Sequence, residues 1–225
     1  MPLDHTGLYP VSSQMGFSRG VVLLDDCEGT FNWTATGTGS DFAASYETDA
    51  AFMGTKGMKL VTKTTTPADG DYVQVRRYMP YPEADLMTMR MRVALEQVSD
   101  CEYVYFIVYP YDGVNQYQGS ILWAPNAGAV WIRESGGGYI EIPGSVWAVV
   151  DGAWVTMEMT LNLADFKYVS AMFNGVRGDM SAFSMDPLGA NTNRYMRFEI
   201  KIVAIGPAIT TVFFDFIYAG EYIEL

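Results

Sequence analysis

Apolar and polar residues alternate along the segment from Trp154 to Gly175, WVTMEMTLNLADFKYVSAMFNG. From Val155 to Leu161 every second residue is apolar and those between are polar, the pattern of a strand with one buried and one solvated face. Turn-forming residues interrupt the pattern at 162–165, and it resumes over 166–173 before the turn dipeptide Asn174-Gly175. The segment therefore predicts a β-meander.

Similar short segments recur along the chain, separated by residues typical of turns. Two of them, Tyr103–Tyr109 and Val212–Tyr218, are apolar on both faces apart from Asp215, so we expect central strands covered on both sides or parts of an interface. No helical stripe of any length is found. The pattern predicts an all-β fold, a two-sheet antiparallel sandwich in one domain over residues 21–225. The other predicted strands are 21–24, 31–34, 58–63, 72–78, 86–96, 129–133, 139–142 and 194–204, with a loop at 35–40.

Residues 1–20 show no periodicity and contain two prolines and three glycines, which predicts an extended N-terminal arm. Since free termini are usually poorly ordered unless something holds them, we expect the arm to bind either the domain's own surface or a neighbouring subunit. The apolar residues expected to make this contact are Leu3, Leu8, Tyr9 and Phe17.

Charge and composition argue against several classes of function. The formal net charge is -12 and the 14 Lys and Arg residues are scattered, so nucleic acid is not an expected partner. No apolar run reaches the length of about 20 residues that a membrane-spanning helix needs, and no signal peptide is visible at the N-terminus. We expect a soluble protein made in the cytoplasm. Cys27 and Cys101 lack metal-binding or redox spacing, so two buried free thiols are predicted, with a disulfide as the alternative.

Three parts of the sequence resemble known jelly-roll sandwiches. Asp25-Asp26-Cys27-Glu28-Gly29 followed by Trp33 resembles the first strand of jelly-roll carbohydrate-binding modules. The meander that starts at Trp154 resembles the centre of concanavalin A-like and laminin-G-like sandwiches, and the segment 212–218 resembles their last strand. The resemblance implies a concanavalin A-like jelly roll over roughly residues 21–220. Such domains often bind sugars or proteins, and they recur as subunits of viral and phage particles, so the fold alone does not define the function.

Catalytic groups of familiar kinds are not found in the expected places. Retaining glucanases of this fold carry paired carboxylates on one strand face as E-x-D-x-E, because two carboxyl groups must flank one glycosidic bond. Glu158 and Glu199 are the nearest candidates, and neither has a carboxylate two residues away. The single histidine, His5, lies in the arm, which argues against a His-based core site. We therefore expect a protein that is not an enzyme.

A structural calcium ion is one interpretation of three carboxylates near the first and last predicted strands. These strands are often neighbours in jelly rolls, and calcium prefers several oxygen ligands. The alternative, which we favour, is that the aspartates near residue 25 cap a turn while the one in the last strand accepts hydrogen bonds from a loop. No other cofactor is expected. The candidate ligands are Asp26, Glu28 and Asp215.

Aromatic side chains on polar strand faces suggest a sugar-binding or partner-binding surface, because flat rings stack on pyranoses while polar neighbours bond their hydroxyl groups. The alternative is that the rings pair across strands or lie in a subunit interface. Charged residues of the alternating strands, Glu158 and Glu199 among them, are expected to form a solvated or ion-paired outer face. The candidate surface comprises Tyr72, Gln74, Arg76, Tyr78, Trp131 and Arg133.

Two functions fit these observations. The first is a structural assembly subunit, such as a decoration or appendage protein on the surface of a virion or another extracellular particle. It would bind a protein shell or copies of itself as a homo-oligomer, through the arm and the two doubly apolar strands. The second is a lectin-like carbohydrate-binding module. Such modules are usually exported and joined to a catalytic domain, and neither feature is visible here, so the assembly subunit is preferred.

Overall fold

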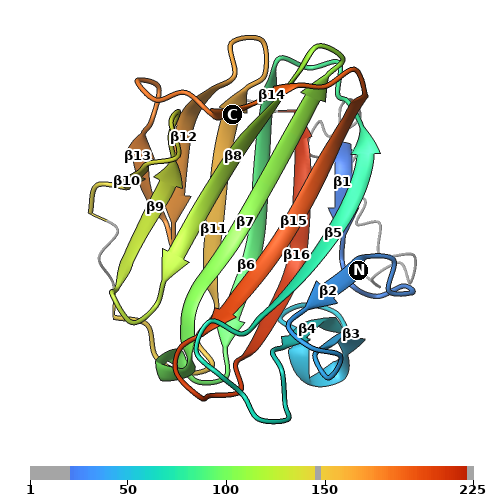
Figure 1. The fold of residues 1–225 in the computed structure, drawn as a ribbon, viewed down its shortest axis with the longest axis vertical. Coiled ribbons are helices and arrows are strands. Elements are labelled where there is room, and N and C mark those ends of the chain that lie inside the picture. The colour runs from blue at the N-terminus through green and yellow to red at the C-terminus, as the bar shows by residue number, and fades with distance from the viewer. Residues whose placement is uncertain (1–20, 145–147, 222–225) are drawn as a thin grey trace, which may run out of the picture.

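The computed structural model describes residues 21–144 and 148–221, and they form two antiparallel sheets of eight strands each. Figure 1 shows the sheets as two layers. The sheet that contains β7 (Cys101–Asp112), called sheet B, lies in front of the sheet that contains β6 (Leu86–Leu95), called sheet A. The predicted arm at 1–20, with Leu3, Leu8, Tyr9 and Phe17, lies outside the described residues. The prediction of an all-β, two-sheet antiparallel sandwich is confirmed.

Sheet A contains the two strands of the predicted meander, β11 and β12, beside the long strands β6 and β16. The final strand β16 also pairs with the first strand β1, so the two ends of the described chain meet in this sheet. In spatial order sheet A consists of β13 (Val176–Asp179), β12 (Lys167–Phe173), β11 (Val155–Asn162), β6 (Leu86–Leu95), β16 (Thr211–Glu221), β4 (Gly57–Val61) and β3 (Ala43–Glu47), with β1 (Val21–Asp25) paired to β16 off this path.

Sheet B is centred on the long neighbouring strands β7 and β15, which pair antiparallel over most of their length. In spatial order it consists of β10 (Tyr139–Glu141), β9 (Ala129–Arg133), β8 (Asn115–Ala124), β7 (Cys101–Asp112), β15 (Arg194–Ala204), β5 (Tyr72–Pro80) and β2 (Thr34–Gly37), with β14 (Asp186–Ala190) paired to β8 off this path. Two short 3-10 helices, η1 (Thr48–Ala50) and η2 (Val98–Asp100), complete the described elements. Within the described ranges, no helix has the length and apolar character needed to cross a membrane.

The core lies between the sheets, and alternation along each strand fills it. In β6 the odd-numbered residues from Met87 to Val93 are fully buried, and in β15 the even-numbered residues from Met196 to Ile202 are. Each large apolar side chain contributes about 1.5–3 kcal/mol when buried rather than exposed. Because one side of each strand is committed to this core, the opposite side of each sheet is free for other contacts.

The two strands predicted to be apolar on both faces are central. β7 lies between β8 and β15 in sheet B, and β16 lies between β6 and β4 in sheet A. Asn174 and Gly175, with φ of 47° and 89°, form the predicted tight turn between β12 and β13. The single-domain boundary at residue 21 stays a prediction, since the arm is not described.

Several strands were not predicted correctly. The predicted strand at 31–34 and loop at 35–40 are wrong, because the strand is β2 at Thr34–Gly37. Gly37 suggested a loop, but a Cβ there would lie 2.7 Å from the Phe42 ring and 2.8 Å from the Tyr72 carbonyl oxygen, so glycine permits close packing within the sheet. β3, β8, β13 and β14 were missed. In β8 the first half, NQYQ, is polar on both faces and shows no alternation.

Cys27 and Cys101 are free, as predicted, and both are fully buried. Burial raises the pKa of both thiols, and the nearby charges of Asp25 and Glu102 raise the pKa of Cys27 and Cys101 respectively. Both groups are therefore protonated and poorly reactive at neutral pH.

Candidate functional site

The outer face of sheet B combines charged and aromatic side chains across its three central strands. The strand register places Glu199 of β15 between Arg76 of β5 and Ile107 of β7. Because neighbours in a sheet point to the same side, the alternate residues of these strands share the outer face with Glu199. They are Tyr72, Gln74, Arg76 and Tyr78 of β5; Tyr195, Arg197, Glu199 and Lys201 of β15; and Tyr103, Tyr105, Ile107, Tyr109 and Tyr111 of β7.

Four charged residues form the centre of this face, and we call Arg76, Arg197, Glu199 and Lys201 the cationic cluster. Glu199 is only 4% exposed, and its Oε1 lies 2.9 Å from Nε of Arg197. Burial raises the pKa of the Glu199 carboxyl, while the charges of Arg197 and Arg76 oppose that shift. Burial also lowers the pKa of Lys201, and the charge of Glu199 opposes this. The cluster thus has three cations for one carboxylate.

Tyrosine rings lie against two of the three cations, Arg197 and Lys201. The Arg197 guanidinium carbon lies 3.9 Å from the ring centroid of Tyr109, and the ammonium nitrogen of Lys201 lies 4.6 Å from that of Tyr72 and 5.8 Å from that of Tyr105. These distances are within the range of cation-π attraction. Burial raises the pKa of both Tyr105 and Tyr109, so their hydroxyl groups are hydrogen-bond donors at neutral pH.

A second group of rings extends the face along the same strands. Tyr195 lies 4.2 Å from Tyr111 and 5.3 Å from Tyr78, measured between ring centroids. Tyr78 is 50% exposed and Tyr111 is buried, so the group reaches from the sheet to the solvent. Together with the cationic cluster, these rings give a face that offers both flat apolar surface and hydrogen-bond donors.

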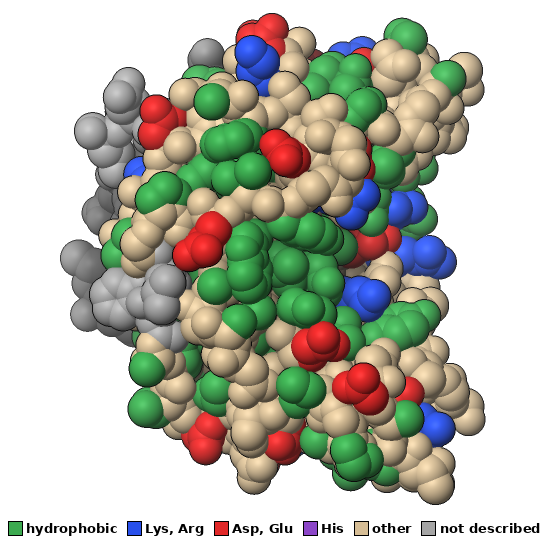
Figure 2. Space-filling view, turned by 60° about the vertical axis from the view of Figure 1, so that its left-hand side comes forward, with side chains coloured by type: hydrophobic (Ala, Val, Ile, Leu, Met, Phe, Trp, Pro, Cys, Tyr) green, Lys and Arg blue, Asp and Glu red, His purple; other side chains and the backbone are tan. Residues whose placement is uncertain are grey.

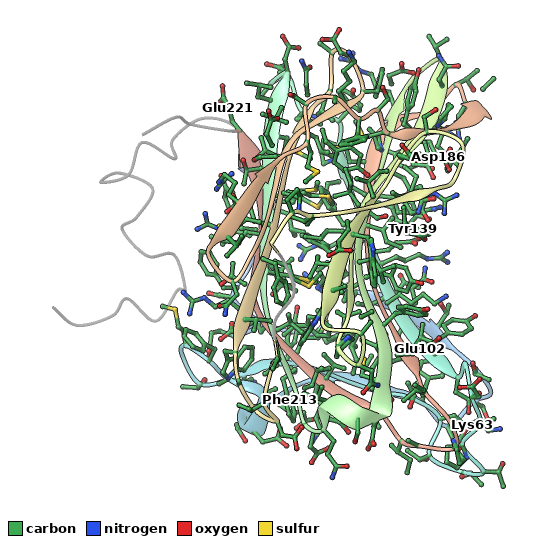
Figure 3. The ribbon with its side chains drawn as sticks, turned by 90° about the vertical axis from the view of Figure 1, so that its left-hand side faces the viewer. Lys63, Glu102, Tyr139, Asp186, Phe213 and Glu221 are labelled. Carbon is green, nitrogen blue, oxygen red and sulfur yellow. The ribbon has the colours of Figure 1, made fainter. Side chains whose placement is uncertain are left out.

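The face is hollowed. In Figure 2 the outer face of sheet B forms the right-hand profile, which is drawn in between two protruding ends, and Lys, Arg and hydrophobic side chains gather in the hollow. Figure 3 shows the sheets edge-on, with Tyr139 and Asp186 directed to the outer side of sheet B and Phe213 to the opposite side of the sandwich. A chain-like ligand could therefore lie across sheet B.

The residues predicted as a sugar or partner surface share this face, but in two places. Tyr72, Gln74, Arg76 and Tyr78 lie on β5, whereas Trp131 and Arg133 lie on β9, with β15, β7 and β8 between them. At about 4.8 Å per strand, the two groups are about 19 Å apart. Arg133 is already paired, because its Nε donates to Asp186 at 2.8 Å and its Nη2 lies 2.7 Å from the same carboxylate. The binding role of all six residues stays a prediction.

The cationic cluster and the tyrosines of β7 were not predicted as the centre of a site. The segment 103–109 was interpreted as apolar on both faces because tyrosine was counted as apolar. The signal that would have found it is tyrosine at alternate positions, Tyr103, Tyr105, Tyr109 and Tyr111, with buried residues between them. The charged residues of β15 were predicted to form a solvated or ion-paired outer face. The excess of cations over carboxylates on that face depends on which strands are neighbours, and the sequence does not reveal this.

The three carboxylates proposed for calcium are bonded to backbone amides instead. Oδ2 of Asp215 accepts from the N–H groups of Phe52 and Met53, at 2.9 and 2.7 Å, and Oε1 of Glu28 accepts from that of Lys56 at 3.0 Å. Oδ1 of Asp26 accepts from the N–H of Glu28 at 3.2 Å. Within residues 21–144 and 148–221, no group of three or more His, Cys, Asp or Glu side chains is arranged to hold a metal ion. The calcium site stays a prediction, and the hydrogen bonds match its alternative.

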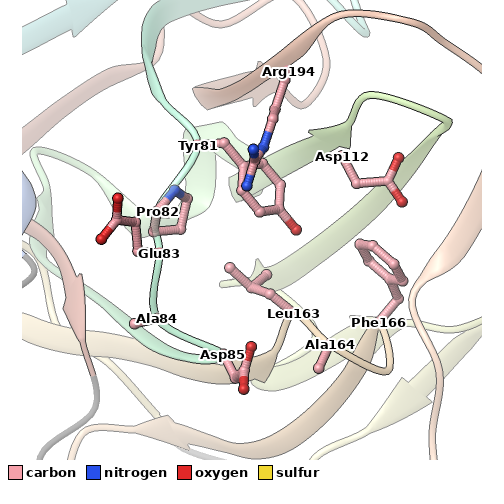
Figure 4. Close-up of a pocket in the computed structure, with 10 residues that line it drawn as sticks. All are labelled: Tyr81, Pro82, Glu83, Ala84, Asp85, Asp112, Leu163, Ala164, Phe166 and Arg194. Carbon is pink, nitrogen blue, oxygen red and sulfur yellow. The ribbon is translucent and has the colours of Figure 1, made fainter.

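A small cavity of about 360 Å³ opens where β5 ends and β15 begins, beside the loops that precede β6 and β12 (Figure 4). Arg194 lies over the Tyr81 ring, 5.5 Å from its centroid, and burial raises the pKa of Tyr81 to about 12. Oδ1 of Asp112 accepts from the N–H groups of Val114 and Asn115 and so shapes the adjoining turn. We assign this cavity no chemistry.

Comparisons with known proteins support the fold. No family model and no curated protein matches the sequence. Among solved structures, the chain resembles an endo-β-1,4-glucuronan lyase from the fungus Trichoderma reesei, with a TM-score of 0.59 at 13% identity over 86% of this chain and 92% of that one. It also resembles the globular domain of T. cruzi calreticulin, with a TM-score of 0.58 at 15% identity over 90% and 89% of the two chains.

A carbohydrate esterase of the Shiga toxin-encoding bacteriophage phi24B matches with a TM-score of 0.56 at 16% identity, over 85% of this chain and 91% of that one. At such low identities these likenesses show the fold alone. The fold is a concanavalin A-like jelly-roll β-sandwich, which confirms the predicted resemblance.

The expectation that the protein is not an enzyme is corrected by these comparisons. Structures that match over most of this chain include a polysaccharide lyase and a carbohydrate esterase, so enzymatic activity is compatible with the fold. The expectation rested on the missing E-x-D-x-E pattern and on the position of His5. That reasoning tested two kinds of mechanism and left acid-base chemistry by Tyr, Lys and Arg open.

Proposed function

We propose that the protein binds a polysaccharide chain along the outer face of sheet B. The observation that supports this most strongly is the alignment of tyrosine rings, most of them partly exposed, with charged groups across three strands of one open, hollowed face. Sugar rings stack on flat aromatic faces, and their hydroxyl groups bond to Arg, Gln and Glu side chains. At the level of the fold, the similarity to proteins named for glucuronan and for carbohydrate esters is consistent with this function.

A glycan array with the full chain tests the proposal. Tyr78→Ala removes a half-exposed ring from the face, and Phe52→Ala is the matched control, since Phe52 is 40% exposed and lies near Trp154 and Arg92, away from sheet B. We expect wild type and the Phe52 variant to bind the same polysaccharide, and the Tyr78 variant to bind it more weakly. An array on which the wild-type protein binds no polysaccharide would reject the proposal.

Cleavage of the bound chain is a second candidate function, and the position of Lys201 favours it. Because burial lowers its pKa, Lys201 loses its proton more readily than an exposed lysine and could serve as a general base. In an elimination, the neutral form of Lys201 would take the proton on the carbon beside a sugar carboxyl group, a carbon–carbon double bond would form as the neighbouring bond to the glycosidic oxygen breaks, and the hydroxyl group of Tyr105, which stays protonated at neutral pH, would give a proton to that leaving oxygen. Base and acid would then lie on one face of the chain.

New reducing ends released from the polysaccharide that the array identifies would measure cleavage. Lys201→Gln should lower the rate about 100-fold or more, the usual loss for a general base. The same variant should still bind the polysaccharide, which separates loss of chemistry from loss of folding. If wild type releases no ends from a chain that it binds, the cleavage function is wrong and the binding function stands.

The assembly role and the location on a particle surface stay predictions. The arm that would make the contacts lies outside the described residues, and the two strands predicted to be apolar on both faces are central in their sheets. Light scattering coupled to size exclusion, with and without residues 1–20, would test the role. A closed oligomer that depends on the arm would support it, and a monomer in both cases would contradict it.

A further inference from the structure

The geometry points to an anionic polysaccharide, in which acidic sugars place their carboxylates on the cationic cluster. This inference rests on the proposed function, since it names the class of chain that the outer face of sheet B would bind. Three observations support it. They are the excess of cations on that face, the guanidinium N–H groups of Arg76 and Arg197 that lack a hydrogen-bond acceptor within the part of the chain that the structure describes, and the different arrangement on the opposite face of the same sandwich.

The balance of charge in the cationic cluster is opposite to that of the whole protein. The chain has a formal net charge of -12, whereas the cluster holds Arg76, Arg197 and Lys201 against Glu199 alone. Arg197 and Lys201 lie two residues from Glu199 on either side along β15, so their backbones are about 13 Å apart. A local excess of cations favours an anion at that position, whereas the net negative charge of the rest of the protein repels anions elsewhere.

Glu199 does not use up the donors around it. Nε of Arg197 is within ion-pair distance of the carboxylate but is not aligned for a hydrogen bond. Nε of Arg76 and Nε of Arg197 are both buried, and neither has a hydrogen-bond partner among the described residues. A buried donor without a partner is costly, and a guanidinium has five N–H groups in a planar fork that fits a carboxylate. Because these two Nε atoms are buried while both side chains are partly exposed, an incoming carboxylate would bond to the outer N–H groups of the guanidinium and not to Nε.

The outer face of sheet A shows what a self-contained arrangement looks like. There Glu158, which is 1% exposed, accepts hydrogen bonds from Nε of Arg90 at 2.7 Å and from Nη2 of Arg177. Both arginines thus use the fork to bind a carboxylate of the protein itself. In the cationic cluster Arg197 also pairs with a carboxylate of the protein, Glu199, and it lies over the Tyr109 ring, but Glu199 is the one carboxylate of the cluster beside three cations.

Calorimetric titration of the full chain with two matched ligands tests the inference. The ligands are glucuronic acid oligosaccharides of one length and the same oligosaccharides with every carboxyl group reduced to an alcohol. We expect the acidic ligand to bind about tenfold more tightly or better, because hydrogen bonds to charged groups are the stronger ones. Added salt should narrow this difference, since part of it comes from charges that salt screens.

Three variants assign the difference to the cluster. Arg76→Gln and Arg197→Gln should each reduce the preference for the acidic ligand while binding of the reduced ligand stays nearly constant. Lys59→Gln changes the net charge equally but alters an ion pair with exposed Asp49 on sheet A, so it should leave the preference unchanged. Circular dichroism and the melting temperature of each variant show whether it is folded, and either arginine variant suffices if the other is not.

The outcomes separate the two proposals. Equal binding of both ligands, or a preference that neither arginine variant alters, would overturn the anionic class and leave polysaccharide binding intact. If neither these ligands nor any polysaccharide on the array binds, both proposals are overturned. If Lys59→Gln and Arg76→Gln reduce the preference for the acidic ligand by the same factor, the preference depends on the total charge of the protein. That result also contradicts the role of the cationic cluster.

Discussion

Arg197 lies over the ring of Tyr109, with its guanidinium carbon 3.9 Å from the ring centroid, and it also approaches the buried carboxylate of Glu199. The ring limits the movement of the guanidinium, and Glu199 is a single carboxylate beside the three cations of the cluster. In this way a strand pair of sheet B presents a fixed cation on an open face, which is useful for binding an anion and contributes little to stability.

Substitution of Tyr109 separates the ring from its hydroxyl group. Tyr109→Phe keeps the stacking on Arg197, so the preference for acidic over reduced oligosaccharides should remain. Tyr109→Ala removes the ring, and binding of the acidic ligand should weaken about two- to fivefold, the contribution of an exposed cation-π pair. Titration of both variants measures this. Equal affinities for the Phe and Ala variants would show that the ring does not position the cation.

The raised pKa of Glu199 predicts how stability depends on pH. In the folded protein this carboxyl keeps its proton above its ordinary pKa of 4.5, because burial disfavours the charged form. Between 4.5 and the raised pKa, the folded state binds more protons than the unfolded state, so the contribution of Glu199 to stability falls as pH rises. Below this window the contribution is fully present.

Glu199→Gln has no such group, so the free energy of unfolding of wild type minus that of the variant should fall as pH rises through this window and then become constant. Urea denaturation at a series of pH values gives both free energies. A difference that rises with pH would mean that the cations dominate over burial and lower the pKa of Glu199.

Asp25 provides a test of stability away from the proposed site. It is 6% exposed and accepts hydrogen bonds from Nε1 of Trp33 and the hydroxyl of Tyr46, both at 2.6 Å, and from the N–H of Cys27 at 2.9 Å. Asp25→Ala would leave these donors without an acceptor and should lower the free energy of unfolding by about 3 kcal/mol. Asp49→Ala removes an exposed ion pair and should change it by less than about 0.5 kcal/mol. Similar costs for the two variants in urea denaturation would contradict this assignment.

Gly175 is constrained by its backbone. Its φ is 89°, which other residues adopt only with strain, although a Cβ there would meet no atom within 4 Å. Gly175→Ala should therefore lower the free energy of unfolding by about 1 kcal/mol. Gly29 is the control, since its surroundings are equally open and its φ is not positive. Gly29→Ala should be neutral, and an equal loss in both variants would point to a cause other than the turn.

More of the fold than of the site could be predicted from the sequence. Alternation in segments such as Val155–Leu161 depends only on which side of a strand is buried, and this is visible in the residues themselves. β8 could not be predicted in this way, because the residues of its first half are polar on both faces and show no apolar–polar alternation. β2 could not be predicted either, because Gly37 is required there by close contacts with Phe42 and Tyr72, which a local pattern does not show.

The proposed site could be predicted only in part. Tyr72, Gln74, Arg76 and Tyr78 share a face because they alternate on one strand, and the sequence shows this directly. Their neighbours on β15 and β7 join them only through strand order and register, which no local pattern determines. The excess of cations around Glu199 is therefore a property of the sheet and not of any one segment.

Binding of a polysaccharide to the outer face of sheet B can be tested by one titration. Wild type, Tyr78→Ala and Phe52→Ala would each be titrated with the polysaccharide that the array selects. We expect measurable affinity for wild type, the same affinity for the Phe52 variant and a weaker affinity for the Tyr78 variant. Equal affinities for all three proteins, with Tyr105→Ala also unaffected, would place the binding surface elsewhere and contradict the account.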